Sequence, residues 1–331
     1  MEPTENLSRD TEAVADSLAA MIMRERTNAS CSYYEGYLNS SDPNLITADD
    51  RTALVDWCYS VVDHCQFSRE TVASAMEMVD RFLSMPSNSA DAARVSDEAL
   101  RDQSKLQLLT VAALYTSIKL NEKVVISSET FSEMCRRLYS AAEIEDMEHT
   151  LLCGNSWRCR APTAHQVGMS VLSLLLPYVD IPEVTWGFFM DEMRYLTELA
   201  VRDYYFSTQR TSTIALAAIF NVIRDATTRE RQELLGSFLR VIMECYDFDH
   251  PVQLAAARKR LNSLTEKPRT LSEGGDFSDD WSLDSSVKTS KISNRSSHKR
   301  KRDLELEGCF CREIDEFDTA HAVSPTRFFP I

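Results

Sequence analysis

Apolar residues recur at helical spacing along most of this chain, and they stop doing so near residue 264. A side chain that returns every three or four positions marks one buried face of a helix. Leu54, Trp57, Val61 and Cys65 form such a stripe. The pattern predicts helices over residues 11–26, 50–64, 68–85, 104–122, 128–138, 141–155, 163–176, 183–205, 211–226, 229–246 and 252–264.

Two of these segments, 104–122 and 211–226, are apolar on nearly every side and rich in alanine. A helix of that kind is surrounded by other helices. Each is third in a set of five, so the sequence predicts an all-α fold of two five-helix bundles in tandem. The chain holds only 8 glycines, fewer than a sheet protein with many tight turns normally needs.

The expected domains are an N-terminal arm over 1–49 with a docking helix, a first bundle over 50–162, a second over 163–265, and a tail over 266–331. Ser, Asp, Glu and Lys dominate the tail, so we expect it to be disordered. Residues 86–103 are polar and small, and we expect a loop there with one helical turn near 97–101.

Net charge, composition and the motifs that are missing argue against several classes of protein. The net charge of −15 disfavours direct binding to nucleic acid, because such a surface repels phosphates. No apolar run is long enough for a membrane span, and no leader-like segment precedes the helices. The 9 cysteines are scattered, so we expect no metal site and no cofactor. No catalytic triad or phosphate-binding glycine loop is present in the sequence, so we do not expect this protein to be an enzyme.

Charged residues interrupt the apolar helices at Arg51, Asp80, Lys119 and Glu148. A charge in such a place must pair within its own fold or meet a partner on another protein. Pattern alone also allows a simpler interpretation, in which Lys119 extends its amine to water and Glu148 lies on a solvated helix face.

The strings Arg-Thr-Ala-Leu-Val-Asp-Trp at 51–57, Asp-Arg-Phe-Leu-Ser at 80–84 and Ile-Lys-Leu-Asn-Glu at 118–122 resemble the cyclin box. The resemblance covers about residues 50–163 and weakens over the second bundle. It implies tandem cyclin folds that bind and activate a cyclin-dependent kinase. The five residues that match the recurrent positions of this family are Arg51, Asp80, Leu108, Lys119 and Glu148.

The resemblance also implies residue roles. Arg51 and Asp80 form a structural ion pair, while Lys119 and Glu148 hold the regulatory helix of the kinase. The surrounding cleft is expected to be apolar, although each apolar candidate taken singly could equally be core. The candidate contacts around the pair are Leu120, Glu122, Phe131, Ile144, Leu151 and Trp157.

A second family feature is an apolar patch that recruits substrates or inhibitors with an Arg-x-Leu motif. Arg51, Leu54 and Trp57 match that patch, but Asp50 stands where recruiting cyclins usually have methionine. The chain has no destruction box of the mitotic type and no Leu-x-Cys-x-Glu motif. We therefore expect a G1-like or D-type-like cyclin acting in G1 or at the G1/S transition.

The tail contains one dense basic cluster, Lys299, Arg300, Lys301 and Arg302, that resembles a nuclear import signal. A solvated run of charge is the alternative interpretation. Ser324 precedes Pro325 in a pattern that cyclin-dependent kinases phosphorylate. We expect a nuclear protein with a cytoplasmic fraction, and a tail that shortens its lifetime.

Two relatives of this function stay open. One is a transcriptional cyclin, whose kinase acts on RNA polymerase. The other is a transcription factor built from tandem cyclin folds, which should be basic and usually has an N-terminal zinc ribbon. The acidic charge and the absence of cysteine from the first 30 residues disfavour the second.

Overall fold

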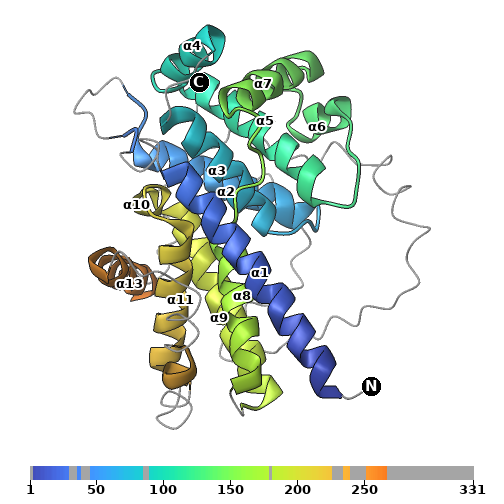
Figure 1. Ribbon diagram of the computed structural model, residues 1–331. Helices are drawn as coiled ribbons and strands as arrows, with labels where there is room; N and C mark the ends of the chain where they lie inside the picture. Colours follow the sequence, from blue (N-terminus) through green and yellow to red (C-terminus); the bar gives the residue numbers. More distant parts are fainter. Residues whose placement is uncertain are drawn as a thin grey trace, which may run out of the picture. The chain divides into compact units, whose positions relative to one another are not determined.

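The fold is described from a computed structural model, over residues 3–29, 36–38, 45–84, 89–178, 181–225, 234–238 and 251–266. Within these residues every regular element is a helix, which confirms the predicted all-α class (Figure 1). The predicted tail from residue 267 onward lies outside the described residues, as does most of the helix predicted over 229–246.

The first bundle surrounds α5, as the apolar pattern predicted. The buried residues of α5 run without interruption from Leu106 to Ile118, and this helix packs against α3, α4 and α7. Its middle is therefore hidden, and only its two ends reach the surface. The helices of this bundle are α2 (Ala48–His64), α3 (Glu70–Ser84), α4 (Ala90–Ala99), α5 (Gln103–Asn121), α6 (Ser128–Met134) and α7 (Ala141–Gly154).

The loop predicted over 86–103 is wrong for most of its length, because α4 occupies it. Ser89 caps this helix by accepting a hydrogen bond from the Ala92 N–H, and Ala92, Val95 and Ala99 face the core. The stripe is made of small residues, so its periodicity is weak in the sequence. The helix predicted to reach residue 138 ends at Met134 instead, where Arg136 and Arg137 adopt positive φ.

Local hydrogen bonds start two helices of the first bundle. Thr47 accepts from the N–H of Asp50, and the Asp50 carboxylate accepts in return from the N–H of Thr47. Ser140 and Glu143 form the same reciprocal arrangement at α7. Such capping boxes satisfy backbone donors that a helix cannot pair by itself. They fix the register of the helices that present the charged residues.

The second bundle is built around α11 in the same way. Ala215, Ala217 and Ala218 are fully buried and permit close packing with α8 and α9. A helix predicted over 183–205 is interrupted at Asp203, which leaves the helix and caps the short helix after it. The described elements are α8 (Ala164–Leu175), η2 (Leu176–Tyr178), α9 (Glu183–Arg202), α10 (Tyr204–Ser207), α11 (Thr211–Asp225), a helical turn at 234–238 and α13 (Pro251–Glu266).

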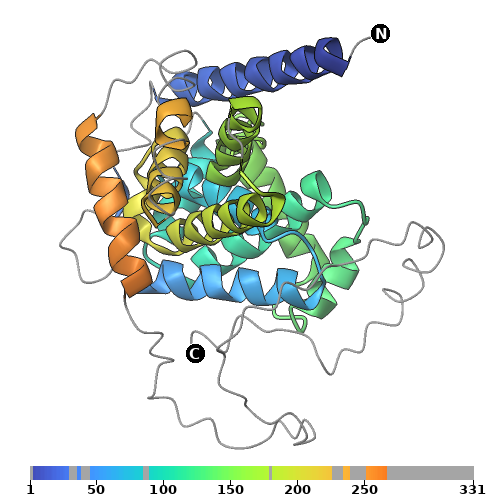
Figure 2. The same cartoon turned by 90° about the horizontal axis from the view of Figure 1, so that it is seen from below.

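The N-terminal helix α1 (Pro3–Ala29) docks on the second bundle, whereas the sequence predicted a docking helix over 11–26 without assigning it to either bundle (Figures 1 and 2). Leu18 and Ile22 belong to the core of that bundle. The buried carboxylate of Glu25 accepts hydrogen bonds from the N–H of Ser212 at 2.7 Å and from its hydroxyl at 2.6 Å. Glu25 thus supplies α11 with an N-terminal cap from a distant part of the chain.

Candidate functional site

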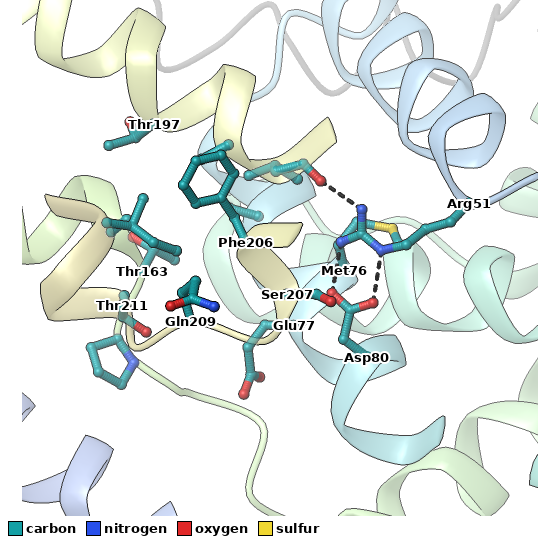
Figure 3. Close-up of a pocket in the computed structure, with 16 residues that line it drawn as sticks. Arg51, Met76, Glu77, Asp80, Thr163, Thr197, Phe206, Ser207, Gln209 and Thr211 are labelled. Carbon is teal, nitrogen blue, oxygen red and sulfur yellow. Dashed lines mark hydrogen bonds and ion pairs between the residues drawn. The ribbon is translucent and has the colours of Figure 1, made fainter. Parts of the chain in front are cut away.

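Arg51 of α2 and Asp80 of α3 form a two-pronged ion pair in the interior. The Arg51 Nε donates to Asp80 Oδ1 at 2.8 Å, and its Nη2 donates to Oδ2 at 2.7 Å (Figure 3). Both side chains are buried, at 4% and 5% exposure. The pair also joins other segments, because Arg51 Nη1 donates to the Val201 carbonyl at 2.8 Å and the Tyr37 hydroxyl donates to Asp80 at 2.8 Å.

A small cavity of about 80 Å³ lies beside this pair, and Figure 3 shows its lining. Its walls come from α2 and α3 on one side and from α9, α10 and α11 on the other. Burial raises the pKa of Glu77 in this wall, while its ion pair with Arg81 opposes the rise. Thr163 also lines the cavity, and its hydroxyl donates to Glu70 at 2.8 Å. The hydrogen bonds from Arg51 to the Val201 carbonyl and from Thr163 to Glu70 join the two bundles beside this cavity.

Lys119 and Glu148 form a second ion pair at the surface end of α5. The Lys119 ammonium donates to Glu148 Oε2 at 2.6 Å. The lysine side chain is 37% exposed and that of Glu148 is 12% exposed. Both simpler interpretations are therefore incomplete, because the lysine side chain is partly exposed while its ammonium is bound to a carboxylate that is itself mostly buried. The arrangement presents a fixed cation with hydrogen-bond donors left over.

Trp157 gives this part of the first bundle an exposed aromatic surface. Its side chain is 63% exposed and its ring lies edge-on to that of His149, at 6.4 Å between centroids. The backbone of Trp157 adopts a φ of 60° just after α7, and its N–H donates to the Leu152 carbonyl at 2.8 Å. A large exposed aromatic group is typical of an interaction site.

Most of the other residues predicted to contact the kinase are buried or partly buried. Phe131, Ile144 and Leu151 are core residues without exposed surface, which fits the alternative interpretation as core, and their contact with a kinase stays a prediction. Leu120 is partly buried, and its carbonyl accepts from Arg160 Nη2 at 2.9 Å.

Glu122 has a local task at the start of α3. Its Oε1 accepts hydrogen bonds from the Ser68 N–H, at 3.0 Å, and from the Thr71 hydroxyl. These bonds stabilise the first turn of α3, so Glu122 acts there as a capping group.

The residues predicted for substrate docking do not form an exposed patch. Arg51, Leu54 and Trp57 are all buried, and Trp57 has no exposed surface. Asp50 is occupied by its capping box and accepts from Gln103 Nε2 at 2.9 Å. An Arg-x-Leu motif would therefore need other residues, or a different conformation, to find an apolar surface here.

Sequence reasoning missed two residues at the Lys119 site. The Thr116 hydroxyl lies 2.7 Å from Glu148 Oε1, and the Tyr115 ring lies under the Lys119 ammonium at 4.2 Å from its centroid. Both precede Lys119 by about one helical turn, which places them on its face of α5. That spacing was available in the sequence, but the contact with Glu148 on another helix was not.

Several predicted sites lie outside the described residues, namely the basic cluster Lys299, Arg300, Lys301 and Arg302 and the phosphorylation candidate Ser324. Within the described part of the chain, no group of three or more His, Cys, Asp or Glu is placed to hold a metal ion. No helix in that part is long and apolar enough to cross a membrane.

Comparison with known proteins gives these features a context. The family model for the cyclin N-terminal domain matches residues 18–160. Cyclin-A2-1 of Oryza sativa is 26% identical over 175 residues, which cover 53% of this chain and 32% of that protein. G2/mitotic-specific cyclin-B2 of Oryzias luzonensis is 24% identical over 198 residues, covering 60% of this chain and 44% of the relative.

A solved structure shares the fold. The viral cyclin from herpesvirus saimiri superimposes with a TM-score of 0.53 at 13% identity, over 75% of this chain and 97% of the viral chain. The sequence matches are shorter, and this chain spans 32% and 36% of the first two curated relatives.

Proposed function

We propose that this chain, which belongs to the cyclin family, binds and activates a cyclin-dependent Ser/Thr protein kinase. Cyclins are non-catalytic regulatory subunits, so the chain is a regulator and not an enzyme. The observation that carries the proposal is the Lys119–Glu148 pair, a cation fixed at the surface end of a buried helix. Its location within the matched cyclin domain supports a role in kinase binding.

The proposed mechanism is a shift of population in the kinase. Lys119 donates hydrogen bonds to the regulatory helix of the kinase, and this contact exists only when the helix occupies its active position. A ligand that binds one conformer better moves the equilibrium toward that conformer. In the active conformer a glutamate on the kinase helix pairs with the catalytic lysine, which positions the phosphates of ATP.

Trp157 is proposed as the second contact. Its exposed ring offers the apolar area that the buried Phe131, Ile144 and Leu151 do not. Aromatic anchors frequently dominate binding energy at protein interfaces. We propose the partly buried Leu120 and the aliphatic stem of Lys119 as further apolar contacts on α5.

The cell-cycle stage and location are finer parts of the proposal. We propose action in G1 or at G1/S, in the nucleus with a cytoplasmic fraction, with import through residues 299–302. The relatives include a mitotic cyclin-B2, which makes the stage a question for experiment. Protein levels across a synchronised cell cycle would peak before DNA replication if the proposal is right, and at mitosis if it is wrong.

The first test uses purified protein and a panel of cyclin-dependent kinases, with phosphorylation of a peptide substrate as the measurement. The wild-type chain is compared with the double variant Lys119→Ala/Glu148→Ala, and circular dichroism checks that both are folded. Activity from the wild type alone supports an activating cyclin that uses this pair. Equal activity from both contradicts the site, and activity from neither across the panel contradicts kinase activation.

A further inference from the structure

The contacts around Glu148 show that the two members of the ion pair have different surroundings. Both carboxylate oxygens are engaged by α5, because Oε2 accepts from Lys119 at 2.6 Å and Oε1 lies 2.7 Å from the Thr116 hydroxyl. Glu148 itself is buried, whereas the lysine is over a third exposed. The group offered to a partner is therefore the ammonium, and Glu148 acts on the partner through it.

The Thr116 hydroxyl has one proton and two acceptors within reach. One is the Ala112 carbonyl at 2.8 Å, and the other is the Glu148 carboxylate at 2.7 Å. A carboxylate is the stronger acceptor, since hydrogen bonds to an ionised group are about twice as strong as neutral ones. Donation from Thr116 satisfies Glu148 Oε1, the oxygen that Lys119 does not bind, and holds the carboxylate in one orientation.

Tyr115 fixes the ammonium from the other side. Its ring centroid lies 4.2 Å from Lys119 Nζ, a distance at which the face of an aromatic ring attracts a cation. The ring is itself held in place, since it is buried and stacks on Phe131 at 5.3 Å between centroids. Packing in the core therefore helps to fix the position of a charged group at the surface.

We infer that Thr116 and Tyr115 are positioning residues that fix the Lys119 ammonium for the kinase, Thr116 through Glu148 and Tyr115 through its ring. The inference rests on the proposed function, since it specifies how the kinase-binding cation is held. It assigns the direct contact to Lys119 and gives Thr116 an effect on binding that its burial alone would not suggest.

The test compares three threonine variants by calorimetric titration with the kinase that the wild type binds. Thr116→Val removes the hydroxyl at nearly constant volume and should raise Kd about tenfold, equal to about 1.4 kcal/mol. Thr116→Ser restores the hydroxyl and should bring Kd back to within about twofold of wild type. Thr110→Val is the matched control, because Thr110 is buried on the same helix and donates only to the Leu106 carbonyl.

Tyr115 is tested with a pair of variants that separate ring from hydroxyl. Tyr115→Phe keeps the ring and should leave Kd within about twofold, whereas Tyr115→Leu removes it and should weaken binding by about threefold to fivefold. Equal effects of the two variants would contradict the role of the ring. Wild-type Kd for Thr116→Val, or equal losses for Thr116→Val and Thr110→Val, would overturn the role of the hydroxyl.

A measurement without the kinase keeps failure of the inference apart from failure of the proposed function. Side-chain NMR relaxation at Lys119 reports how firmly the ammonium is held in the chain alone. The order parameter should fall in Thr116→Val and in Tyr115→Leu, and stay unchanged in Thr116→Ser and Thr110→Val. An unchanged order parameter in Thr116→Val overturns the inference even if the chain activates a kinase.

Discussion

Arg51–Asp80 and Lys119–Glu148 are the same kind of bond in two different settings. Each joins two helices of the first bundle with a nitrogen to oxygen distance below 3 Å. Arg51 is enclosed, forms two parallel hydrogen bonds to Asp80, and reaches α9 through the Val201 carbonyl. Lys119 forms one bond to its carboxylate and keeps part of its side chain in solvent.

The difference teaches how one fold uses charge for two purposes. A buried pair with its hydrogen-bonding capacity used internally positions helices, and losing one partner leaves an uncompensated charge. A pair with an exposed cation adds little to stability, because water competes for it, but it can bind a partner in a fixed geometry. Burial and the number of internal bonds therefore distinguish the Arg51–Asp80 pair, which joins helices in the interior, from the Lys119–Glu148 pair, which we propose as a binding site.

The largest expected effect comes from breaking the buried pair. Asp80→Ala should lower the free energy of unfolding by about 3–5 kcal/mol, because it leaves the Arg51 guanidinium buried without its carboxylate. Urea denaturation measures the loss. The matched control is Arg202→Ala, which breaks an exposed pair with Asp56 and should cost less than about 1 kcal/mol. Similar losses in the two variants would contradict the contrast.

The exposed pair should show the opposite behaviour. Lys119→Ala should lower the free energy of unfolding by about 1–2 kcal/mol, less than Asp80→Ala does, because Thr116 still donates to the buried Glu148 carboxylate that loses the ammonium. It should weaken kinase binding by about thirtyfold, or about 2 kcal/mol, because it removes the proposed contact. Calorimetric titration gives the Kd and urea denaturation the stability. Lys105→Ala, near the other end of α5, serves as the control and should bind like the wild type.

The exposed ring of Trp157 offers a smaller test of the proposed interface. Trp157→Ala should raise the kinase Kd about tenfold with little change in stability, because its ring is exposed. Val184→Ala, at another exposed apolar position in the second bundle, controls for a general loss of apolar surface. If Trp157→Ala binds as wild type does, the proposed interface does not include this ring.

The smallest effect concerns Glu25, a buried carboxylate held by Ser212. Burial raises the pKa of Glu25 above its ordinary value of 4.5, although the hydrogen bonds to Ser212 oppose the rise. The folded chain then keeps its proton more readily than the unfolded chain. This contribution to stability is therefore present at low pH and is lost as pH rises above about 4.5 through the folded pKa.

Glu25→Gln should remove that dependence. We expect the melting temperature of the wild type to fall relative to the variant across this pH range, measured by circular dichroism on both proteins. A constant difference between the two melting temperatures at every pH would contradict the raised pKa.

Much of the helix pattern was predictable, because every expected segment overlaps at least in part with a described helix or helical turn. The loop predicted over 86–103 was wrong, because most of it forms α4. The buried face of α4 consists of Ala92, Val95 and Ala99, so it gives little hydrophobic contrast in the sequence. Periodicity reports a buried face only when that face is made of large apolar residues.

The candidate site was less predictable than the fold. The choice of Lys119, Glu148 and Trp157 as candidate residues followed from the resemblance. How exposed each of their side chains is could not be predicted from it. Ile144 and Glu148 lie one helical turn apart on α7, yet only tertiary packing decides that Glu148 meets Lys119 while Ile144 lies in the core. Thr116 was missed for the same reason, since its contact joins two helices that are distant in sequence.

A charge exchange at the exposed pair, measured as activation of the kinase by the full chain, tests most directly whether the Lys119 ammonium contacts the kinase. Lys119→Glu combined with Glu148→Lys keeps two opposite charges side by side but places a carboxylate at the exposed position. Our account predicts a folded protein, with a melting temperature close to that of wild type, that no longer activates the kinase. Activation equal to that of the wild type would contradict the claim that the exposed ammonium makes the contact.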